Sequence, residues 1–263
     1  RHQKLIEETP CAVLSEELRQ AMGEAACRLA REVGYAGAGT VEFLYSEGAF
    51  YFLEMNTRLQ VEHGITELRY GVDLVREQLR VASGATVAEP RAPHGHAIEV
   101  RVNAEDPENF FPSLGTVTRL YTPGGPGVRL DSVLYRGLEV TPHYDSMLGK
   151  LMVHADDRPA AIARMRRAVG ELRIAGVTTS LPACLRVLAD PRFRSGDYDT
   201  SVLAQVDRTI PEPVEELAAL AAAVARYLGT ERVGGADSAA PRGAGIAPWV
   251  LADRAERVGR RSW

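Results

Sequence analysis

One segment of this chain, residues 41–63, constrains the fold more than any other part of the sequence. Two apolar and aromatic runs flank a short loop that contains Gly48, which is the pattern of a β-hairpin. A turn centred on Gly48 places Glu42 directly opposite Glu54. Two like charges facing each other across a strand pair destabilise it, so the pattern favours a cation, such as a divalent metal, between them.

Beyond the hairpin, polar side chains recur with the two-residue period of a strand. If the chain stays extended past Met55, then Glu54, Asn56, Arg58 and Gln60 share one face. Carboxylate and amide oxygens suit Mg²⁺ or Mn²⁺, and a guanidinium can hold a planar anion with two hydrogen bonds. The alternative is a solvated face of an edge hairpin, whose charges guard against aggregation. Taken alone, these residues leave both interpretations open.

Several motifs in one order extend this pattern over residues 1 to about 205. They are R-H-Q-K at 1–4, G-Y-A-G-A-G-T-V-E-F at 34–43, E-M-N-T-R-L-Q-V-E-H at 54–63, G-H-A-I-E-V-R-V-N-A-E-D-P at 95–107, P-S-L-G at 112–115, T-P-G-G-P-G-V-R at 122–129 and Y-D-S-M-L-G-K-L at 144–151. Together they resemble the biotin carboxylases, the ATP-grasp component of acetyl-CoA, propionyl-CoA and pyruvate carboxylases.

The resemblance implies an α+β fold in three parts. Residues 1–88 would be the C-terminal half of an ATP-grasp domain, residues 89–206 the biotin carboxylase C-terminal domain with an antiparallel sheet, and residues 207–263 a helical or flexible tail. The proline-containing segment at 89–95 would link the first two.

The same resemblance implies ATP-dependent carboxylation of carrier-bound biotin by bicarbonate through carboxyphosphate. Glu42 and Glu54 would hold Mg²⁺ or Mn²⁺ against the phosphates of ATP, Asn56 would complete a second metal site, and His2 would face the nucleotide.

Bicarbonate and biotin would be handled by a second group of residues. The resemblance implies that bicarbonate binds to Lys4, Arg58, Gln60 and the backbone amide of Val61, that Glu62 is the general base, and that Arg101 binds biotin and stabilises its enolate. Arg58, Glu62 and Arg101 would be the catalytic residues. Each has a simpler interpretation: Glu62 as an acid at a helix N-terminus, Arg101 as a surface ion-pair arginine and His63 as a structural residue.

The resemblance also implies partners: a biotin carboxyl carrier protein or domain, a carboxyltransferase and a second copy in a homodimer. It does not indicate the final carboxyl acceptor. Two positions depart from the family: Gly64 stands where proline is usual, which should affect loop stiffness, and Pro126 stands where an aromatic residue is usual in a dimer contact.

Composition fits a cytoplasmic protein. The net charge of −4 gives no support to nucleic-acid binding, and the longest apolar run, 217–225, is too short to span a bilayer. The three cysteines are odd in number and lack metal spacing, which is typical of reduced thiols.

The chain opens on Arg1 inside a family motif, so we expect a fragment whose phosphate loop is missing and which is inactive alone. The alternatives are a non-catalytic remnant that keeps dimerisation or carrier-docking surfaces, and another ATP-grasp carboxylate ligase.

Local signals predict the remaining elements. We expect helices that begin after Ser15 and near Asp73, the second with Val75 and Leu79 inward, and a strand at 96–103. Further helices are predicted from about Pro159, with Ile162, Met165, Val169 and Leu172 inward, from Ser180, and at 214–228, before a linker at 229–246.

Overall fold

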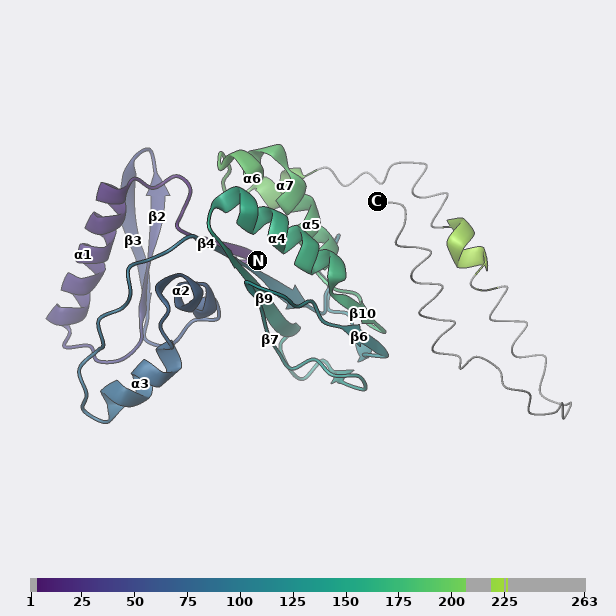
Figure 1. The fold of residues 1–263 in the computed structure, drawn as a ribbon, viewed down its shortest axis with the longest axis horizontal. Coiled ribbons are helices and arrows are strands. Elements are labelled where there is room, and N and C mark those ends of the chain that lie inside the picture. The colour runs from purple at the N-terminus through teal and green to yellow at the C-terminus, as the bar shows by residue number, and fades with distance from the viewer. Residues whose placement is uncertain (1–3, 207–218, 225, 227–263) are drawn as a thin grey trace, which may run out of the picture. The chain divides into compact units, whose positions relative to one another are not determined.

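The structure, a computed structural model, describes residues 4–206, 219–224 and 226 (Figure 1). Residues 1–207 form one compact unit and residues 208–263 a second. In the second unit, residues 219–224 are helical, so the helix predicted at 214–228 lies only partly within the described residues. The linker predicted at 229–246 lies outside them, and the domain division at residue 88 stays a prediction.

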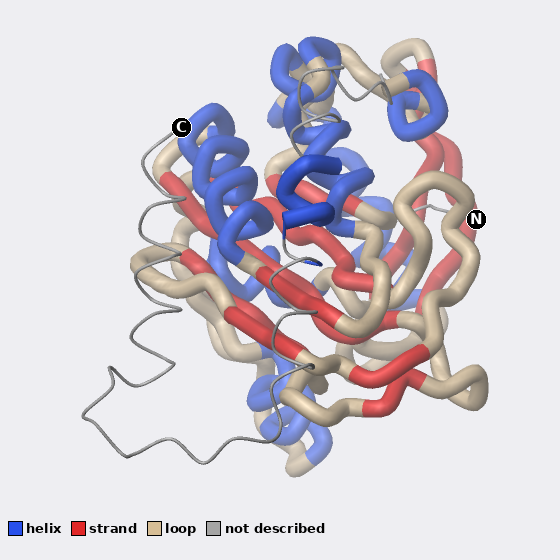
Figure 2. The backbone as a smooth tube through the Cα atoms, turned by 90° about the vertical axis from the view of Figure 1, so that its right-hand side faces the viewer, coloured by secondary structure: helices blue, strands red, loops and turns tan. Residues whose placement is uncertain are grey.

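A four-stranded antiparallel sheet is the centre of the first unit (Figure 2). Its strand order is β1-β4-β9-β7, with bounds Ile6–Thr9, His96–Asn103, Met147–Ala155 and Val128–Ser132. The strand predicted at 96–103 is therefore confirmed. The register pairs Glu7 with Glu99 and Arg101 with Lys150. Because directly paired residues project to the same side, this register collects four charged side chains on one face.

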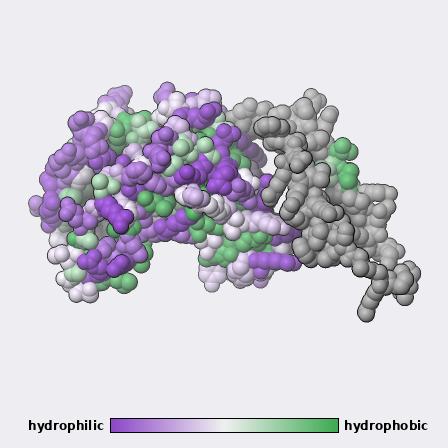
Figure 3. All heavy atoms as spheres, in the orientation of Figure 1, coloured by the Kyte–Doolittle hydropathy of each residue, from purple (hydrophilic) through white to green (hydrophobic). Residues whose placement is uncertain are grey.

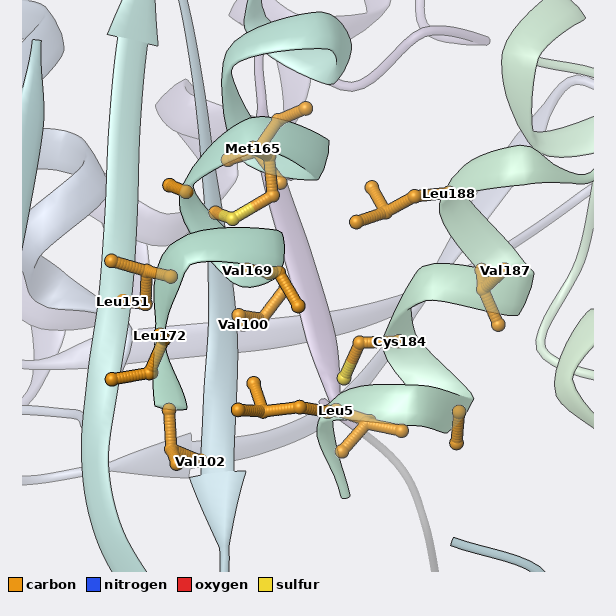
Figure 4. Close-up of a cluster of buried hydrophobic side chains, with 14 of the residues drawn as sticks. Leu5, Val100, Val102, Leu151, Met165, Val169, Leu172, Cys184, Val187 and Leu188 are labelled. Carbon is orange, nitrogen blue, oxygen red and sulfur yellow. The ribbon is translucent and has the colours of Figure 1, made fainter. Parts of the chain in front are cut away.

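Helices α4 (Arg158–Glu171) and α5 (Leu181–Ala189) cover the other face, which is apolar. All four side chains predicted to face inward from α4 and its C-cap are buried: Ile162, Met165, Val169 and Leu172. Figure 4 shows Met165 and Val169 gathered with Val100, Leu151 and Cys184 in one core. Asp157 caps α4 by accepting a hydrogen bond from the backbone of Ala160, and two short helices follow α5, α6 (Pro191–Ser195) and α7 (Val202–Gln205).

The charged face of the sheet carries α2 (His63–Tyr70). Leu151 and Met152 are neighbours in β9, so they project to opposite faces. Met152 packs with Ala97 against Ile65 and Leu68, which places α2 on the opposite side from α4. The apolar contact beneath α2 is small, and most of this layer is built from charged groups.

The predicted hairpin consists of β2 (Thr40–Ser46) and β3 (Ala49–Asn56). Glu42 is paired with Glu54, as predicted, with a bulge directly after Glu42. Strand β3 ends at Asn56, so the extended conformation predicted as far as Gln60 is wrong. The chain turns there because α2 begins only a few residues later.

Helix α1 (Glu16–Glu32) begins as predicted, with Ser15 accepting a hydrogen bond from the backbone of Leu18. Helix α3 (Leu74–Ala82) begins as predicted after Asp73, which accepts from the backbone of Arg76. The inward placement of Val75 and Leu79 is wrong, since their exposed fractions are 47% and 69%. Helical periodicity identifies an apolar stripe, but no described residue buries these two side chains.

Two small sheets complete the described part of the first unit, β5 (Gly115–Thr116) with β8 (Glu139–Val140) and β6 (Arg119–Tyr121) with β10 (Arg173–Ala175). Figure 3 shows hydrophobic residues at the surface scattered among hydrophilic ones. None of the helices in the described ranges has the length and apolar character needed to cross a membrane. All three cysteines are unpaired; Cys184 is buried, whereas Cys11 and Cys27 are exposed.

Glu8 ties the edge strand β1 to the helical layer. Its carboxylate accepts hydrogen bonds from His96 Nε2 at 2.7 Å, Arg158 Nε at 2.7 Å and the Tyr198 hydroxyl at 2.6 Å. Burial alone would raise the pKa of Glu8, but these three donors outweigh it and lower the pKa to about 2. Glu8 is therefore a charged clamp between β1, α4 and the segment after α6.

We predict that Glu8→Gln lowers the free energy of unfolding by about 3 kcal/mol at neutral pH, because it leaves buried cations without their partner. An acid whose folded pKa is depressed contributes stability above its unfolded pKa of 4.5 and loses it as the pH falls toward 2. The difference between parent and variant should therefore narrow below about pH 4.5 in urea titrations.

The matched control is Glu32→Gln on the exposed surface of α1, which should change stability by less than about 0.5 kcal/mol. A Glu8→Gln penalty that is the same in acid as at neutral pH would contradict the clamp.

Candidate active site

The predicted site residues converge where the loop at residues 57–62 meets the charged face of the sheet. The loop leaves β3 at Asn56 and enters α2 at His63. Its turn brings the Gln60 side chain, which is only 7% exposed, back beside Glu42. The site is thus built from the hairpin, the loop, the segment before β1 and strand β4.

Glu42 is the acceptor at the centre of this site. Its Oε1 atom accepts hydrogen bonds from Lys4 Nζ at 2.5 Å, Gln60 Nε2 at 2.9 Å and Asn56 Nδ2 at 3.0 Å. The bonds from Lys4 and Gln60 lower the pKa of Glu42, so the carboxylate is charged at neutral pH. Lys4 has a φ of 61°, a left-handed conformation that costs a lysine about 1 kcal/mol and persists where the surroundings fix it.

Asn56 connects the two hairpin acids. Its Nδ2 atom lies 3.0 Å from Glu42 Oε1 and 3.1 Å from Glu54 Oε1, so both carboxylates and the amide lie on the same side of the hairpin. The Oε2 atom of each acid accepts no hydrogen bond from any described residue. These hard oxygens fit Mg²⁺ or Mn²⁺, provided that Asn56 turns its own oxygen inward.

Two carboxylates and an amide form an open set of donors. Across the described ranges, no three His, Cys, Asp or Glu side chains come together as a metal site. A cation here would need further oxygens, and Mg²⁺ commonly takes these from phosphate groups of a bound nucleotide.

Glu62 lies between two cations. Its carboxylate is 3.1 Å from Lys4 Nζ and 3.0 Å from Arg101 Nη2. Glu62 occupies the N-cap position of α2 but makes no side-chain capping hydrogen bond. The simpler interpretation, an acid placed to cap a helix, therefore does not account for its contacts.

Arg101 is partly buried, with 20% of its side chain exposed, and it bridges two acids. Nε donates to Glu7 Oε1 at 3.1 Å, while Nη2 donates to Glu62. The interpretation of Arg101 as a surface ion-pair arginine is wrong, because the alternating strand turns this face toward α2 rather than toward water.

Glu7 and Glu99 form a buried acidic pair that the sequence did not indicate. Burial raises the pKa of Glu7 to about 8, opposed by the Arg101 guanidinium, and burial raises the pKa of Glu99 to about 7. Both oxygens of Glu99 are buried without a hydrogen-bond partner in the described structure. The layer under Arg101 is therefore poor in charge-stabilising contacts and holds protons near neutral pH.

The remaining predicted residues differ in their placement. Arg58 is exposed and reaches Asn56 Oδ1 and the Leu59 carbonyl, each at 3.3 Å, without an acidic partner among the described residues. The backbone amide of Val61 donates to no described residue. His63 has the structural role considered for it, with Nδ1 2.7 Å from the Gln60 carbonyl. His2 lies outside the described residues.

Lys150 is the other participant that the sequence did not reveal. Its Nζ atom donates to the Val61 carbonyl at 2.5 Å, across the full width of the α2 layer. Lys150 lies in the motif Y-D-S-M-L-G-K-L, but nothing local in that motif connects it with a loop almost ninety residues earlier. The pairing of β4 with β9 creates the contact.

Two family profiles match consecutive parts of the chain. Residues 1–90 match the carbamoyl-phosphate synthase L chain, ATP binding domain, and residues 99–205 match the biotin carboxylase C-terminal domain. The biotin carboxylase of Haemophilus influenzae is 50% identical over 199 residues, covering 74% of this chain and 44% of that protein. One pyruvate carboxylase subunit of Methanothermobacter thermautotrophicus is 45% identical over 257 residues, covering 88% and 52%.

A solved structure supports the same relationship. The biotin carboxylase domain dimer of Hydrogenobacter thermophilus 2-oxoglutarate carboxylase, in complex with MgADP, ADP and bicarbonate, superimposes with a TM-score of 0.75 at 42% identity. The match covers 78% of this chain and 46% of that one. The chain thus spans about half the length of the relatives it matches.

Gly64 lies within α2 and not in the loop, which corrects the expectation that it acts on loop stiffness. A Cβ atom at this position would overlap the sulfur of Met152, whose side chain is fully buried. Position 64 is therefore restricted by packing between α2 and β9.

We predict that Gly64→Ala lowers the free energy of unfolding by about 1–3 kcal/mol, because the added methyl overpacks a filled space. With Met152→Val already present, the same change should cost less or stabilise, since alanine is the better helix former by up to about 1 kcal/mol. Urea unfolding of the four proteins in this double-mutant cycle measures the coupling.

Gly23→Ala in α1 is the matched control, because a Cβ there meets nothing within 4 Å. It should stabilise by up to about 1 kcal/mol in either background. Equal effects of Gly64→Ala with and without Met152→Val would rule out the packing explanation.

Proposed function

The chain belongs to the biotin carboxylase family, and from this premise we propose that it contributes to ATP-dependent carboxylation of carrier-bound biotin by bicarbonate. The observation that carries the proposal is the convergence of Glu62, Lys4 and Arg101. An acid held between two cations, next to unpaired backbone amides, suits the handling of a small anion and its proton.

In this proposal, the nucleotide end of the site is the hairpin. Glu42 and Glu54 hold the cation, Asn56 completes a second site, and His2 faces the nucleotide. When bound, Mg²⁺ or Mn²⁺ neutralises phosphate charge, so that two anions can be brought together. The availability of one carboxylate oxygen on each acid supports this assignment.

The bicarbonate end is the loop. Lys4, Arg58, Gln60 and the Val61 amide bind the anion, and Glu62 accepts its proton. The exposed Arg58 guanidinium, which has no acidic partner among the described residues, supports a role in anion binding. Arg101 stabilises negative charge that develops on the biotin ureido oxygen, with Glu7 holding the guanidinium from the sheet side.

The proposal extends to partners by analogy with the relatives. We expect a biotin carboxyl carrier protein or domain, a carboxyltransferase and a homodimer, in a cytoplasmic setting. The relatives include biotin carboxylases, a 2-oxoglutarate carboxylase domain and one pyruvate carboxylase subunit, so the final carboxyl acceptor is left open.

Large apolar side chains on the hairpin support a need for a further part of the ATP-grasp domain. Tyr51, Phe52 and Leu53 are 60%, 58% and 51% exposed. We predict that this chain alone shows no measurable bicarbonate-dependent ATP cleavage, because both halves of a nucleotide site supply positioning energy. A fusion with the part of the Haemophilus influenzae relative that this chain does not span should be active.

The assay is ATP cleavage with and without bicarbonate for both proteins. Full turnover by the chain alone would contradict the prediction. A folded but inactive fusion would favour the alternative of a non-catalytic remnant.

Within an active fusion, Arg58→Ala and Arg101→Ala should separate two steps. Arg58→Ala should depress bicarbonate-dependent ATP cleavage even without biotin. Arg101→Ala should leave that cleavage almost intact and lower carboxylation of free biotin by about a hundredfold, the effect of losing one donor to a developing oxyanion.

Arg136→Ala is the control, since Arg136 is exposed and has no partner among the described residues. Each variant must first match the parent in urea unfolding, because Arg101 also neutralises Glu7 and Glu62. Biotin carboxylation at the parent rate by folded Arg101→Ala would refute the enolate role.

A further inference from the structure

The second lysine of the chain is buried against the loop that the proposed function assigns to bicarbonate. Of the 31 lysine and arginine residues, only Lys4 and Lys150 are lysines. Lys4 contacts Gln60 and Glu62 directly, and Lys150 contacts the carbonyl of Val61, which lies between them. Everywhere else the chain uses arginine, so both of its compact ammonium groups lie at one loop.

The position of the Lys150 ammonium is fixed by its surroundings. Lys150 is 9% exposed, and a buried charge without partners is strongly destabilising. Besides the Val61 carbonyl at 2.5 Å, its neighbours are His63 Nδ1 at 3.4 Å and Asp131 Oδ2 at 4.0 Å. The Val61 carbonyl is the nearest of these, so the ammonium spends its shortest hydrogen bond on the loop.

This contact sets the orientation of a peptide group. In a trans peptide the carbonyl of one residue and the N–H of the next point in opposite directions. A Val61 carbonyl that points toward Lys150 therefore turns the Glu62 N–H away from the sheet. Neither the Val61 N–H nor the Glu62 N–H donates to another described residue, so both are available to an anion.

We propose that Lys150 is a positioning residue, which holds the Val61 carbonyl so that the loop at 58–62 keeps its amides and the Glu62 carboxylate turned toward bicarbonate. Lys150 touches none of the residues proposed to hold the metal. It acts from the sheet side of the loop, through Val61, and not by contact with the anion. The inference rests on the proposed bicarbonate site and deepens it.

The test compares the full chain with Lys150→Met, which keeps the length and apolar stem of the side chain but removes the ammonium. Two quantities are measured by nuclear magnetic resonance on ¹⁵N-labelled protein. One is hydrogen exchange at the amides of His63 and Ile65, which donate to Gln60 and Glu62 within this turn. The other is the dissociation constant for bicarbonate, from shifts of the Val61 and Glu62 amides.

We expect Lys150→Met to accelerate exchange at these two amides and to weaken bicarbonate binding, each by about tenfold, the effect of losing one hydrogen bond to a charged group. Met152→Leu is the matched control, because its side chain also contacts α2 from β9 but does not reach the Val61 carbonyl. It should leave both quantities within about twofold of the parent, since it conserves apolar volume.

Lys150→Arg serves if Lys150→Met does not fold. It keeps the charge and the donors but places a larger planar group in the same space, so its bicarbonate affinity should fall between those of the parent and a charge-free variant.

The outcomes separate two failures. Bicarbonate affinity that is unchanged in folded Lys150→Met, while the parent binds, would overturn the positioning role, even if the loop amides exchange faster. In the Lys150→Arg case, parent-like affinity together with unchanged exchange would do the same. Absence of any bicarbonate-induced shift in the parent would contradict the anion site itself and the inference with it.

Discussion

The contact on which the site depends is the one between the Arg101 guanidinium and two carboxylates from different parts of the chain. Glu7 comes from an edge strand and Glu62 from the loop before α2, and each is about 3 Å from the same side chain. Taking three charges partly out of water is costly unless they compensate one another. The loop can therefore approach the sheet closely only in a geometry that keeps this bridge.

The sheet divides stability and chemistry between its faces. Ile98, Val100 and Val153 have no exposed surface and pack with α4 and α5 in a continuous apolar core. The opposite face has a small apolar contact under α2 and otherwise carries charge. Because one backbone serves both faces, the tightly packed core holds the register that brings Arg101 and Lys150 beside the loop.

The sequence revealed what depends on local signals. The hairpin register of Glu42 and Glu54 follows from the position of one glycine, and the starts of α1 and α3 follow from Ser15 and Asp73 as capping residues. The places of Glu7, Glu99 and Lys150 were beyond it, because they depend on pairing between strands more than forty residues apart. The turn after Asn56 was missed for a related reason: alternating polar residues fit a strand, and only packing of α2 on the sheet ends it.

The fit between Gly64 and Met152 has a consequence for the history of the sequence. A side chain at position 64 and a methionine at position 152 exclude each other within one packed layer. Substitutions at these positions are therefore accessible in a restricted order: shortening residue 152 opens the way for alanine or proline at 64, whereas the reverse order passes through an overpacked intermediate. The unusual glycine and the buried methionine form one heritable unit, although 88 positions separate them in the chain.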